Sequence, residues 1–282
     1  MALPQDFDLD DFVTRVLAED LGTGGDVTST ATIAPDARFT AVMDTRQSIV
    51  IAGMDVAAAF FRRLDPDVHI EPLVADGDRV DPRTDLMRLE GKARAMLSAE
   101  RSALNTLQHL SGIATLTRTY VDAIAGTGAI VLDTRKTLPG LRVLEKYAAR
   151  MGGAQNHRMR LDDGVLIKDN HVAVNGGVAE AVKRAKAANT GLQVQVEVDR
   201  IDQIEPALDA GADRLLLDNM PPHVLREAVA LVAGRVPLEA SGGVTLETIR
   251  AIAETGVNFI SVGRITQSAP SVDIGLDYSV RK

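Results

Sequence analysis

From residue 129 onward, the chain alternates between short apolar runs and longer helix-like runs. The six apolar runs cover residues 129–132, 165–167, 194–198, 214–217, 237–239 and 259–262. The helix-like runs between several of them cover residues 178–188, 201–210, 224–232 and 246–254. Continuous apolar strands separated by helices are typical of a parallel sheet that is covered on both faces. We also expect a weaker seventh strand near residues 152–157.

The polar residues that end these strands distinguish a barrel from an open, doubly wound sheet. They are Lys168, Glu197, Asp218, Ser241 and Gly263, spaced about one strand–helix unit apart. Functional residues at the C-terminal end of every strand are the pattern of an α/β barrel. A doubly wound sheet concentrates them at one switch point instead. The pattern therefore favours the barrel.

The residues before about 105 have a different pattern, which predicts a small α+β domain. Helices are expected over residues 6–20 and 57–64, and extended segments over 39–44, 48–52, 69–75 and 86–89. A long helix should follow over residues 93–125, with a break near Ser111 and Gly112. We assign residues 1–105 to an N-terminal α+β domain, 106–268 to the barrel, and 269–282 to a tail that rejoins the first domain.

Composition excludes several functions. Aromatic residues make up only 3% and the net charge is −8, which argues against a nucleic-acid partner. No apolar run is long enough to span a membrane. Cys is absent, so disulfides and thiolate zinc sites are excluded. The acidic start MALPQDFDLDDF lacks the basic segment of a signal peptide, and we expect a soluble, cytoplasmic protein.

Two glycine-containing turns follow the last two strands of the expected barrel. They are EASGGV, with Ser241, Gly242 and Gly243, and SVGR, with Gly263. Backbone N–H groups of such turns can surround a phosphate, and barrels often bind phosphate at their last two loops. A plain tight turn is the alternative. No P-loop or Rossmann glycine motif occurs.

Two carboxylates, Glu197 and Asp218, end adjacent strands inside otherwise apolar runs. Paired acids beside a phosphate suit Mg²⁺, which prefers a few carboxylates together with water and substrate oxygens. A structural salt bridge from Glu197 to Lys168 is the alternative. The five His residues are scattered, so a zinc site is not expected.

Cations outnumber acids between Asp133 and Val172, with eight Lys or Arg against five Asp or Glu. Some of them have helical spacing and are expected on a solvated face: Arg142, Lys146 and Arg150. Others are expected at strand ends and predict an anionic ligand: Arg135, Lys136, Arg158 and Lys168. Arg101 lies four residues after Leu97 and three before Leu104, so we expect it on the apolar face of a helix. It either extends from the edge of a core or enters a closed site.

The chain also carries an ordered set of distinctive segments. They are EDLGTGGDVTS, ERSALNTLQHLSGIAT, DTRKTLPGLR, NHR, LIKDNH, VQVEVD, LLLDNM, EASGG and the closing DIGLD. Together they extend over nearly the whole chain and closely resemble the quinolinate phosphoribosyltransferase family, of the type II phosphoribosyltransferase fold.

This resemblance implies an incomplete, open α/β barrel of about seven strands with an N-terminal α+β sandwich domain. It implies a reaction of quinolinate with phosphoribosyl pyrophosphate that gives nicotinate mononucleotide, pyrophosphate and carbon dioxide, with Mg²⁺, for NAD biosynthesis. It also implies a homodimer in which the N-terminal domain of one subunit covers the barrel mouth of the other.

The resemblance further implies roles for particular residues. Arg101 would come from the partner subunit and bind a quinolinate carboxylate. The rest of the quinolinate pocket would be Thr134, Arg135, Lys136, His157, Arg158 and Lys168. Catalytic roles would fall to Lys136, Lys168, Glu197 and Asp218, the two acids also holding Mg²⁺ and the ribose hydroxyls. The donor phosphates would be bound by Lys136, Lys168, Ser241, Gly242, Gly243, Val262, Gly263 and Arg264. Asn170 and His171 would lie close to the site.

One loop departs from the family pattern. It usually reads like GALTHS or GALTKS, and here it reads GRITQS, residues 263–268. Arg264 could therefore add charge beside the 5′-phosphate or point to solvent. Three other functions stay open: a related phosphoribosyltransferase for nicotinate or another base, a Schiff-base aldolase that uses Lys168, and a sugar-phosphate sensor without turnover.

Overall fold

The computed structural model describes Leu3 and residues 7–279. Asp6, where the first expected helix begins, lies outside the described residues. The chain divides into two compact units, which we call the N-terminal unit and the barrel unit. The first comprises Met1–Leu116, Val143–Gly153 and Ser268–Lys282, and the second Thr117–Arg142 and Ala154–Gln267.

The N-terminal unit contains an antiparallel sheet in the order β12-β1-β5-β3. Its strands are β1 (Arg38–Thr45), β3 (His69–Pro72), β5 (Asp85–Lys92) and β12 (Ile274–Ser279). Along β1, every second side chain from Phe39 to Thr45 is buried, as expected when one face of a sheet packs on a core. A separate pair, β2 (Ile49–Val50) and β4 (Arg79–Val80), is also antiparallel.

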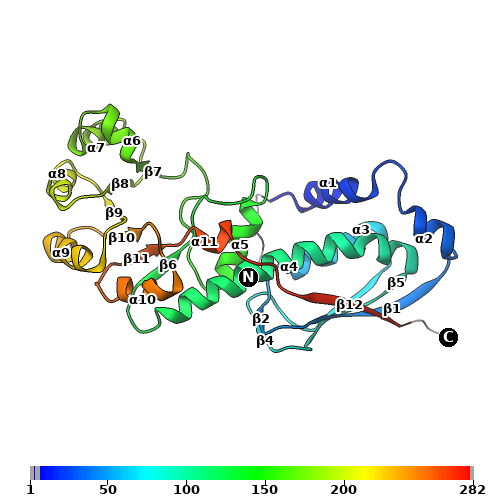
Figure 1. The fold of residues 1–282 in the computed structure, drawn as a ribbon. Helices are drawn as coiled ribbons and strands as arrows, with labels where there is room; N and C mark the ends of the chain where they lie inside the picture. Colours follow the sequence, from blue (N-terminus) through cyan, green and yellow to red (C-terminus); the bar gives the residue numbers. More distant parts are fainter. Residues whose placement is uncertain (1–2, 4–6, 280–282) are drawn as a thin grey trace. The chain divides into compact units, whose positions relative to one another are not determined.

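The helices of this unit are α1 (Leu9–Leu21), α2 (Val27–Thr32), α3 (Met54–Leu64), the first part of α4 (Ala93–Ala123), and α5 (Arg142–Met151) from Val143 onward. Asp8 and Asp26 cap α1 and α2 by accepting backbone hydrogen bonds. Asp76 does the same for α3 from a distant loop, because its carboxylate accepts from the N–H groups of Gly53 and Met54. Figure 1 shows α3 and α4 beside the strands of this unit.

Helix α4 runs without a break, so the expected interruption near Ser111 and Gly112 is wrong. The glycine is needed for packing. A Cβ on Gly112 would lie 2.1 Å from the carbonyl oxygen of Pro270, so the returning chain can pass only where the helix has no side chain. The Ser111 hydroxyl accepts a hydrogen bond from the N–H of Ala52.

The expected solvated face of α5 is also wrong. Glu145 and Lys146 are 0% exposed, and Nε2 of His109 lies 2.9 Å from Oε1 of Glu145. Arg142 and Arg150 are half-buried. The charged side chains of Glu145 and Lys146 therefore lie in the interior of the N-terminal unit. Helical spacing alone does not predict this burial.

The barrel unit contains a parallel sheet in the order β6-β11-β10-β9-β8-β7. The strands are β6 (Ile130–Leu132), β7 (Val165–Ile167), β8 (Val194–Val198), β9 (Arg214–Asp218), β10 (Leu238–Ser241) and β11 (Phe259–Ser261). The seventh strand is reduced to a single parallel bridge between Leu132 and Gln155. The sheet does not close, which confirms an open α/β barrel with an N-terminal α+β part.

The barrel helices are α6 (Asp169–Val174), α7 (Val178–Ala187), α8 (Ile204–Asp209), α9 (Pro222–Val232), α10 (Leu246–Ala253) and α11 (Arg264–Gln267). Helices α7 to α10 lie along the outer side of the row of strands in Figure 1. A short 3₁₀ turn, Ile201–Gln203, precedes α8 where one helix was expected. Buried residues such as Val182, Leu225 and Ile249 show why these amphipathic runs fold against the sheet. Among the described residues, no helix has the length and apolar character needed to cross a membrane.

Candidate active site

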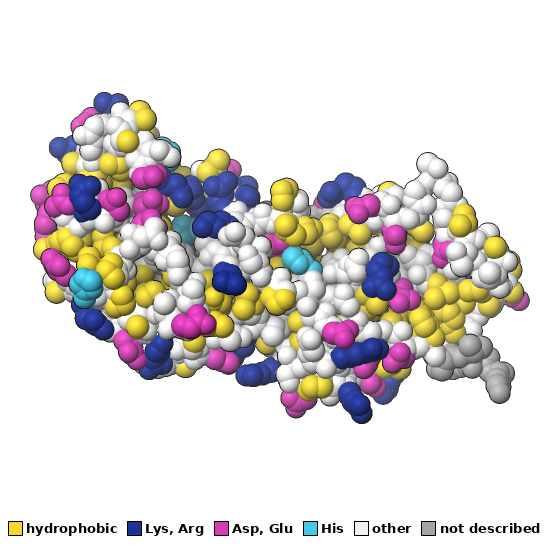
Figure 2. Space-filling model, in the orientation of Figure 1, with side chains coloured by type: hydrophobic (Ala, Val, Ile, Leu, Met, Phe, Trp, Pro, Cys, Tyr) yellow, Lys and Arg dark blue, Asp and Glu magenta, His cyan; other side chains and the backbone are white. Residues whose placement is uncertain are grey.

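A cavity of about 730 Å³ opens at the C-terminal ends of the barrel strands. Most of the site residues expected from the sequence line it: Thr134, Arg135, Lys136, His157, Arg158, Lys168, Glu197, Asp218, Ser241, Gly242, Gly243, Gly263 and Arg264. Figure 2 shows Lys and Arg side chains gathered near a hollow in the surface of the barrel unit. Two expected residues do not line this cavity. Val262 is buried, and Arg101 lies exposed on α4 in the N-terminal unit.

The position of Arg101 corrects one expectation. The buried side of this part of α4 is formed by residues such as Met96, Ala99 and Ala103. Arg101 is on the exposed side. It therefore does not lie on the apolar face of the helix.

Lys136 is placed by contacts with two loops. Its N–H donates to the Thr134 hydroxyl at 3.1 Å, and its carbonyl accepts from the Thr266 hydroxyl at 2.8 Å. A Cβ on Gly263 would lie 2.8 Å from Cδ of Lys136. The lysine chain therefore crosses the backbone of Gly263, and a larger residue there would displace it.

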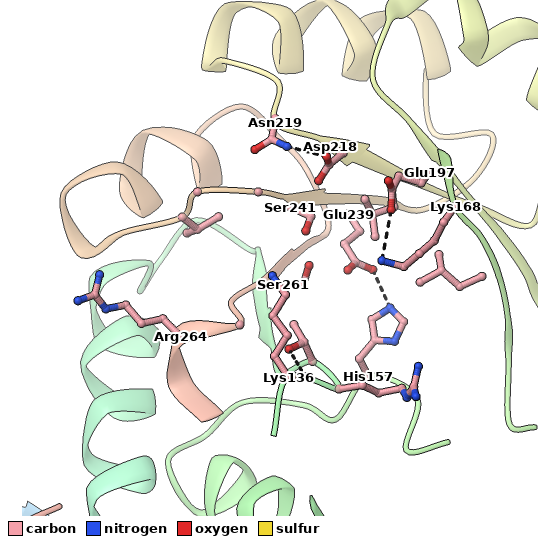
Figure 3. A pocket seen from close by; sticks show the side chains of 18 of the residues that line it. Lys136, His157, Lys168, Glu197, Asp218, Asn219, Glu239, Ser241, Ser261 and Arg264 are labelled. Carbon is pink, nitrogen blue, oxygen red and sulfur yellow. Dashed lines mark hydrogen bonds and ion pairs between the residues drawn. The ribbon is translucent and has the colours of Figure 1, made fainter. Parts of the chain in front are cut away.

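His157 is held by its backbone N–H and by Nδ1 of its ring. The buried Asp133 at the end of β6 accepts from the His157 N–H at 2.8 Å. Nδ1 accepts from the N–H of Arg158 at 2.8 Å, so a neutral ring carries its proton on Nε2. Nε2 lies 3.3 Å from Oε2 of Glu239. The ring therefore lines the cavity with both nitrogens turned toward protein groups (Figure 3).

Arg135 and Arg158 form a positively charged corner. Burial lowers the pKa of the Arg158 guanidinium, and the nearby charge of Arg135 adds to this shift. Arg158 also donates to the carbonyl of Gly164. The buried Nε of Arg135 has no hydrogen-bond partner among the described residues. Two crowded guanidiniums and an unpaired buried donor are the arrangement that an anionic ligand would complete.

On the other side of the cavity, Glu197 and Asp218 end the neighbouring strands β8 and β9. Nζ of Lys168 lies 3.9 Å from Oε2 of Glu197. Burial raises the pKa of Glu197, Lys168 opposes the rise, and the charge of Asp218 adds to it. Lys168 therefore does not offset the burial of Glu197 and its repulsion by Asp218, and a divalent cation at the pair of acids would add the positive charge to do so.

The described residues contain no group of three or more His, Asp or Glu side chains that could hold a metal ion by themselves. A metal at Glu197 and Asp218 would therefore need oxygens from a substrate. This donor set fits Mg²⁺, which commonly binds through one or two carboxylates, water and substrate phosphates.

The turn after β10 supplies backbone N–H groups. Gly242 and Gly243 have φ angles of 92° and 59°, in the left-handed region that favours glycine. Ser241 precedes them on the cavity wall. Arg264 is exposed, and in Figure 3 its side chain points away from His157 and Lys168. Arg264 therefore lies on the rim of the cavity.

The sequence analysis missed Glu239, which lines the cavity yet is 0% exposed. Its Oε2 lies 2.7 Å from Nη2 of Arg214 and accepts from the amide of Gln195 at 2.8 Å. Burial works to raise the pKa of Glu239, but the His157 hydrogen bond and the charges of His157 and Arg214 hold it below its ordinary value. A signal was present, because Glu239 is an acid inside an apolar run, as Glu197 is.

The open barrel, its cationic corner and its glycine turn define a class of protein that binds phosphorylated, multiply anionic small molecules. The chain belongs to the quinolinate phosphoribosyl transferase family. The family model of the C-terminal domain matches residues 113–277, and that of the N-terminal domain matches residues 26–111.

Individual relatives agree with this assignment. The chain is 44% identical over 275 residues to the nicotinate-nucleotide pyrophosphorylase [carboxylating] of Mycobacterium leprae, which covers 95% of this chain and 96% of the relative. It is 42% identical to the probable enzyme of the same name from Bacillus subtilis, over 93% of this chain and 90% of the relative. The solved structure of the nicotinate-nucleotide pyrophosphorylase from Francisella tularensis matches with a TM-score of 0.93 at 40% identity, and covers 99% of this chain and 100% of that one.

Proposed function

We propose that this chain transfers the phosphoribosyl group of phosphoribosyl pyrophosphate to quinolinate with loss of carbon dioxide. The products are nicotinate mononucleotide and pyrophosphate, and the step belongs to NAD biosynthesis. One observation carries the proposal: a single cavity combines a guanidinium corner, two lysines, two acids and a glycine turn. This is the set of groups needed to bring together two anions that repel each other.

Quinolinate would occupy the corner formed by Arg135 and Arg158. Its two carboxylates would use the unpaired Nε of Arg135 and relieve the repulsion between the guanidiniums. Thr134 and His157 would complete the pocket; Nδ1 of His157 already accepts from the N–H of Arg158, and Nε2 lies 3.3 Å from Oε2 of Glu239. A planar guanidinium matches a carboxylate with two parallel hydrogen bonds, which fixes the orientation of the pyridine ring.

The phosphoribosyl donor would lie across the other wall. Its 5′-phosphate would accept hydrogen bonds from the turn at Ser241, Gly242 and Gly243, beside Gly263. Lys136 and Lys168 would face the pyrophosphate. Glu197 and Asp218 would hold the ribose hydroxyls and, through the donor, Mg²⁺. When bound, Mg²⁺ would neutralise charge that develops on the departing pyrophosphate.

Catalysis would then depend mainly on positioning. The ring nitrogen forms a bond to C1 of the ribose as the bond to pyrophosphate breaks, and the leaving oxygen keeps the electron pair. The new pyridinium charge lies beside C2, so it accepts the electrons of the carbon–carboxylate bond when carbon dioxide leaves. A proton then replaces carbon dioxide at C2. The reaction needs no covalent bond to the protein, only fixed geometry and cations at the developing negative charge.

We further propose that the working form is a homodimer in which Arg101 serves the partner's cavity. Arg101 is exposed on α4 of the N-terminal unit, so its guanidinium is accessible to a ligand. A third guanidinium would balance the second carboxylate of quinolinate, which carries one more negative charge than nicotinate.

The decisive assay measures the formation of nicotinate mononucleotide from quinolinate and phosphoribosyl pyrophosphate, with Mg²⁺ and with excess chelator. We expect product only with both substrates and Mg²⁺, and carbon dioxide in equal amount. Nicotinate in place of quinolinate is the control. Faster turnover of nicotinate would assign the chain to a different base, and no turnover of either would contradict the proposal.

A further inference from the structure

Asn219 has a left-handed backbone conformation, which is uncommon for non-glycine residues and which Asn adopts more readily than most. It follows β9 directly and has a φ angle of 55°, in the left-handed region. Among the described residues, the other non-glycine positions with positive φ are Arg83, Asn189 and Ala233, and Asn219 alone of these lines the cavity. Strained residues of this kind persist where the surrounding structure requires them.

The contacts of Asn219 join two loops. Its side-chain Nδ2 donates to Oδ2 of Asp218 at 2.6 Å. Its backbone N–H donates to the carbonyl of Ser241 at 2.9 Å. A Cβ on Gly242 would lie only 2.1 Å from Oδ1 of Asn219, so the amide is packed directly against the glycine turn. Figure 3 shows Asn219 beside Asp218, with the dashed line that joins them.

The positive φ angle makes these contacts compatible. Asp218 pairs with Ser241 across β9 and β10, so the two loops leave the sheet side by side. Because the chain turns at Asn219, its amide can reach back to the preceding carboxylate while its N–H faces the neighbouring strand. An extended residue at this position would turn its side chain elsewhere and separate the two contacts.

We infer that Asn219 is a positioning residue: its amide orients the carboxylate of Asp218 and sets the distance between that carboxylate and the phosphate-binding turn at Gly242. This inference rests on the proposed function, because it assigns Asp218 and Gly242 to the same phosphoribosyl donor. Asn219 itself acts through these two groups. Loss of the Asn219 amide should therefore weaken the binding of the phosphoribosyl donor and of Mg²⁺. It should leave the binding of quinolinate unchanged, because other residues form the quinolinate pocket.

The test uses Asn219→Gly, because glycine adopts positive φ without strain and the fold should survive while the amide is lost. We expect the KM for phosphoribosyl pyrophosphate and the Mg²⁺ concentration for half-maximal rate each to rise about tenfold or more, the size expected for a lost hydrogen bond to a charged group. The KM for quinolinate should change less than about twofold. Asn219→Asp keeps the volume but replaces the donor with a carboxylate beside Asp218, so it should also raise the KM for phosphoribosyl pyrophosphate.

Asn189→Gly is the matched control. Asn189 is also left-handed, with a φ angle of 48°, but it is exposed and does not line the cavity. It should leave all three constants unchanged. If wild type is active and Asn219→Gly behaves like Asn189→Gly, or raises both KM values equally, the inference is wrong and the proposed function stands. If wild type makes no product, the proposed function fails and the inference fails with it.

Discussion

Arg214 and Glu239 form an ion pair between neighbouring strands, with 2.7 Å between Nη2 and Oε2. The glutamate is 0% exposed, and the guanidinium of Arg214 stacks on the ring of Phe259 at 4.0 Å. Removing one member of a buried pair leaves the other charge without compensation. Glu239→Gln should therefore lower the free energy of unfolding by about 3 kcal/mol or more, measured by urea denaturation.

The double variant Arg214→Met with Glu239→Gln checks this reason. It removes both charges and should recover part of the loss, because no buried charge is then left without its partner. A double variant whose loss equals the sum of the single losses would show that the two charges do not depend on each other.

The free energy of unfolding should change with pH because of the raised pKa of Glu197. Burial raises its pKa in the folded state, so the folded chain binds this proton more tightly than the unfolded chain does. The resulting stability is fully present below the unfolded-state pKa and is lost as pH rises through the raised value. Without Mg²⁺, Glu197→Gln should be more stable than wild type near about pH 8 and gain less near about pH 4. The exposed Glu227→Gln on α9 is the control. A gain for Glu197→Gln that does not depend on pH would contradict this explanation.

Lys136→Ala should reduce kcat/KM by about 100-fold or more, because the proposed function places this cation at the departing pyrophosphate. The side chain is exposed, so the melting temperature should stay close to that of wild type. Lys183→Ala removes an exposed lysine on α7, away from the cavity, and should keep full activity. Lys136→Ala with near-normal turnover would remove Lys136 from the mechanism.

Gly112→Ala separates helix propensity from packing. Alanine favours a helix interior by about 1 kcal/mol, yet its Cβ would lie 2.1 Å from the carbonyl oxygen of Pro270. We expect a net loss of about 1 to 3 kcal/mol in thermal or urea unfolding. A Cβ on Gly24 meets no atom within 4 Å, so Gly24→Ala should be nearly neutral. If Gly112→Ala raised the free energy of unfolding, the backbone at Pro270 would have moved away from the new Cβ at little cost, and this packing argument would be wrong.

Mixing two inactive variants tests the shared site. In the proposed dimer, Arg101→Ala would lack the arginine given to the partner and Lys136→Ala would lack its own cavity lysine, so a mixed dimer would contain one complete site. Co-refolded or co-expressed variants should recover about a quarter of wild-type activity, the share expected from random pairing in a two-fold dimer. Each variant mixed with itself is the control. Full activity of Arg101→Ala alone, or no recovery in the mixture, would contradict the donated arginine.

The strands of the barrel unit were predicted well from the sequence. Strands β7 and β8 have the predicted bounds, because short runs dominated by Val, Leu and Ile favour strands. Helix α2 was not predicted. Its residues VTSTAT have little helix preference, and its end is held by Arg94, which donates to the carbonyls of Ile33 and Thr30. Such long-range contacts leave no periodic signal.

The residues of the cavity were also predicted only in part. Lys168, Glu197 and Asp218 could be grouped from the sequence because the ends of parallel strands meet at one edge of a sheet. The contacts of Asn219 and Glu239 depend on side-chain directions and on a positive φ angle, which spacing does not specify. The burial of Lys146 was not predicted for a related reason. Helix α5 is buried on more sides than the spacing of its charged residues indicates.

The division of the chain has a consequence for inheritance. Each compact unit is assembled from separate stretches of sequence, with junctions at Leu116, Arg142, Gly153 and Gln267. A single crossover between two genes therefore cannot exchange either complete unit without also exchanging part of the other. To exchange one complete unit by itself, a chimaera needs breakpoints at all four junctions.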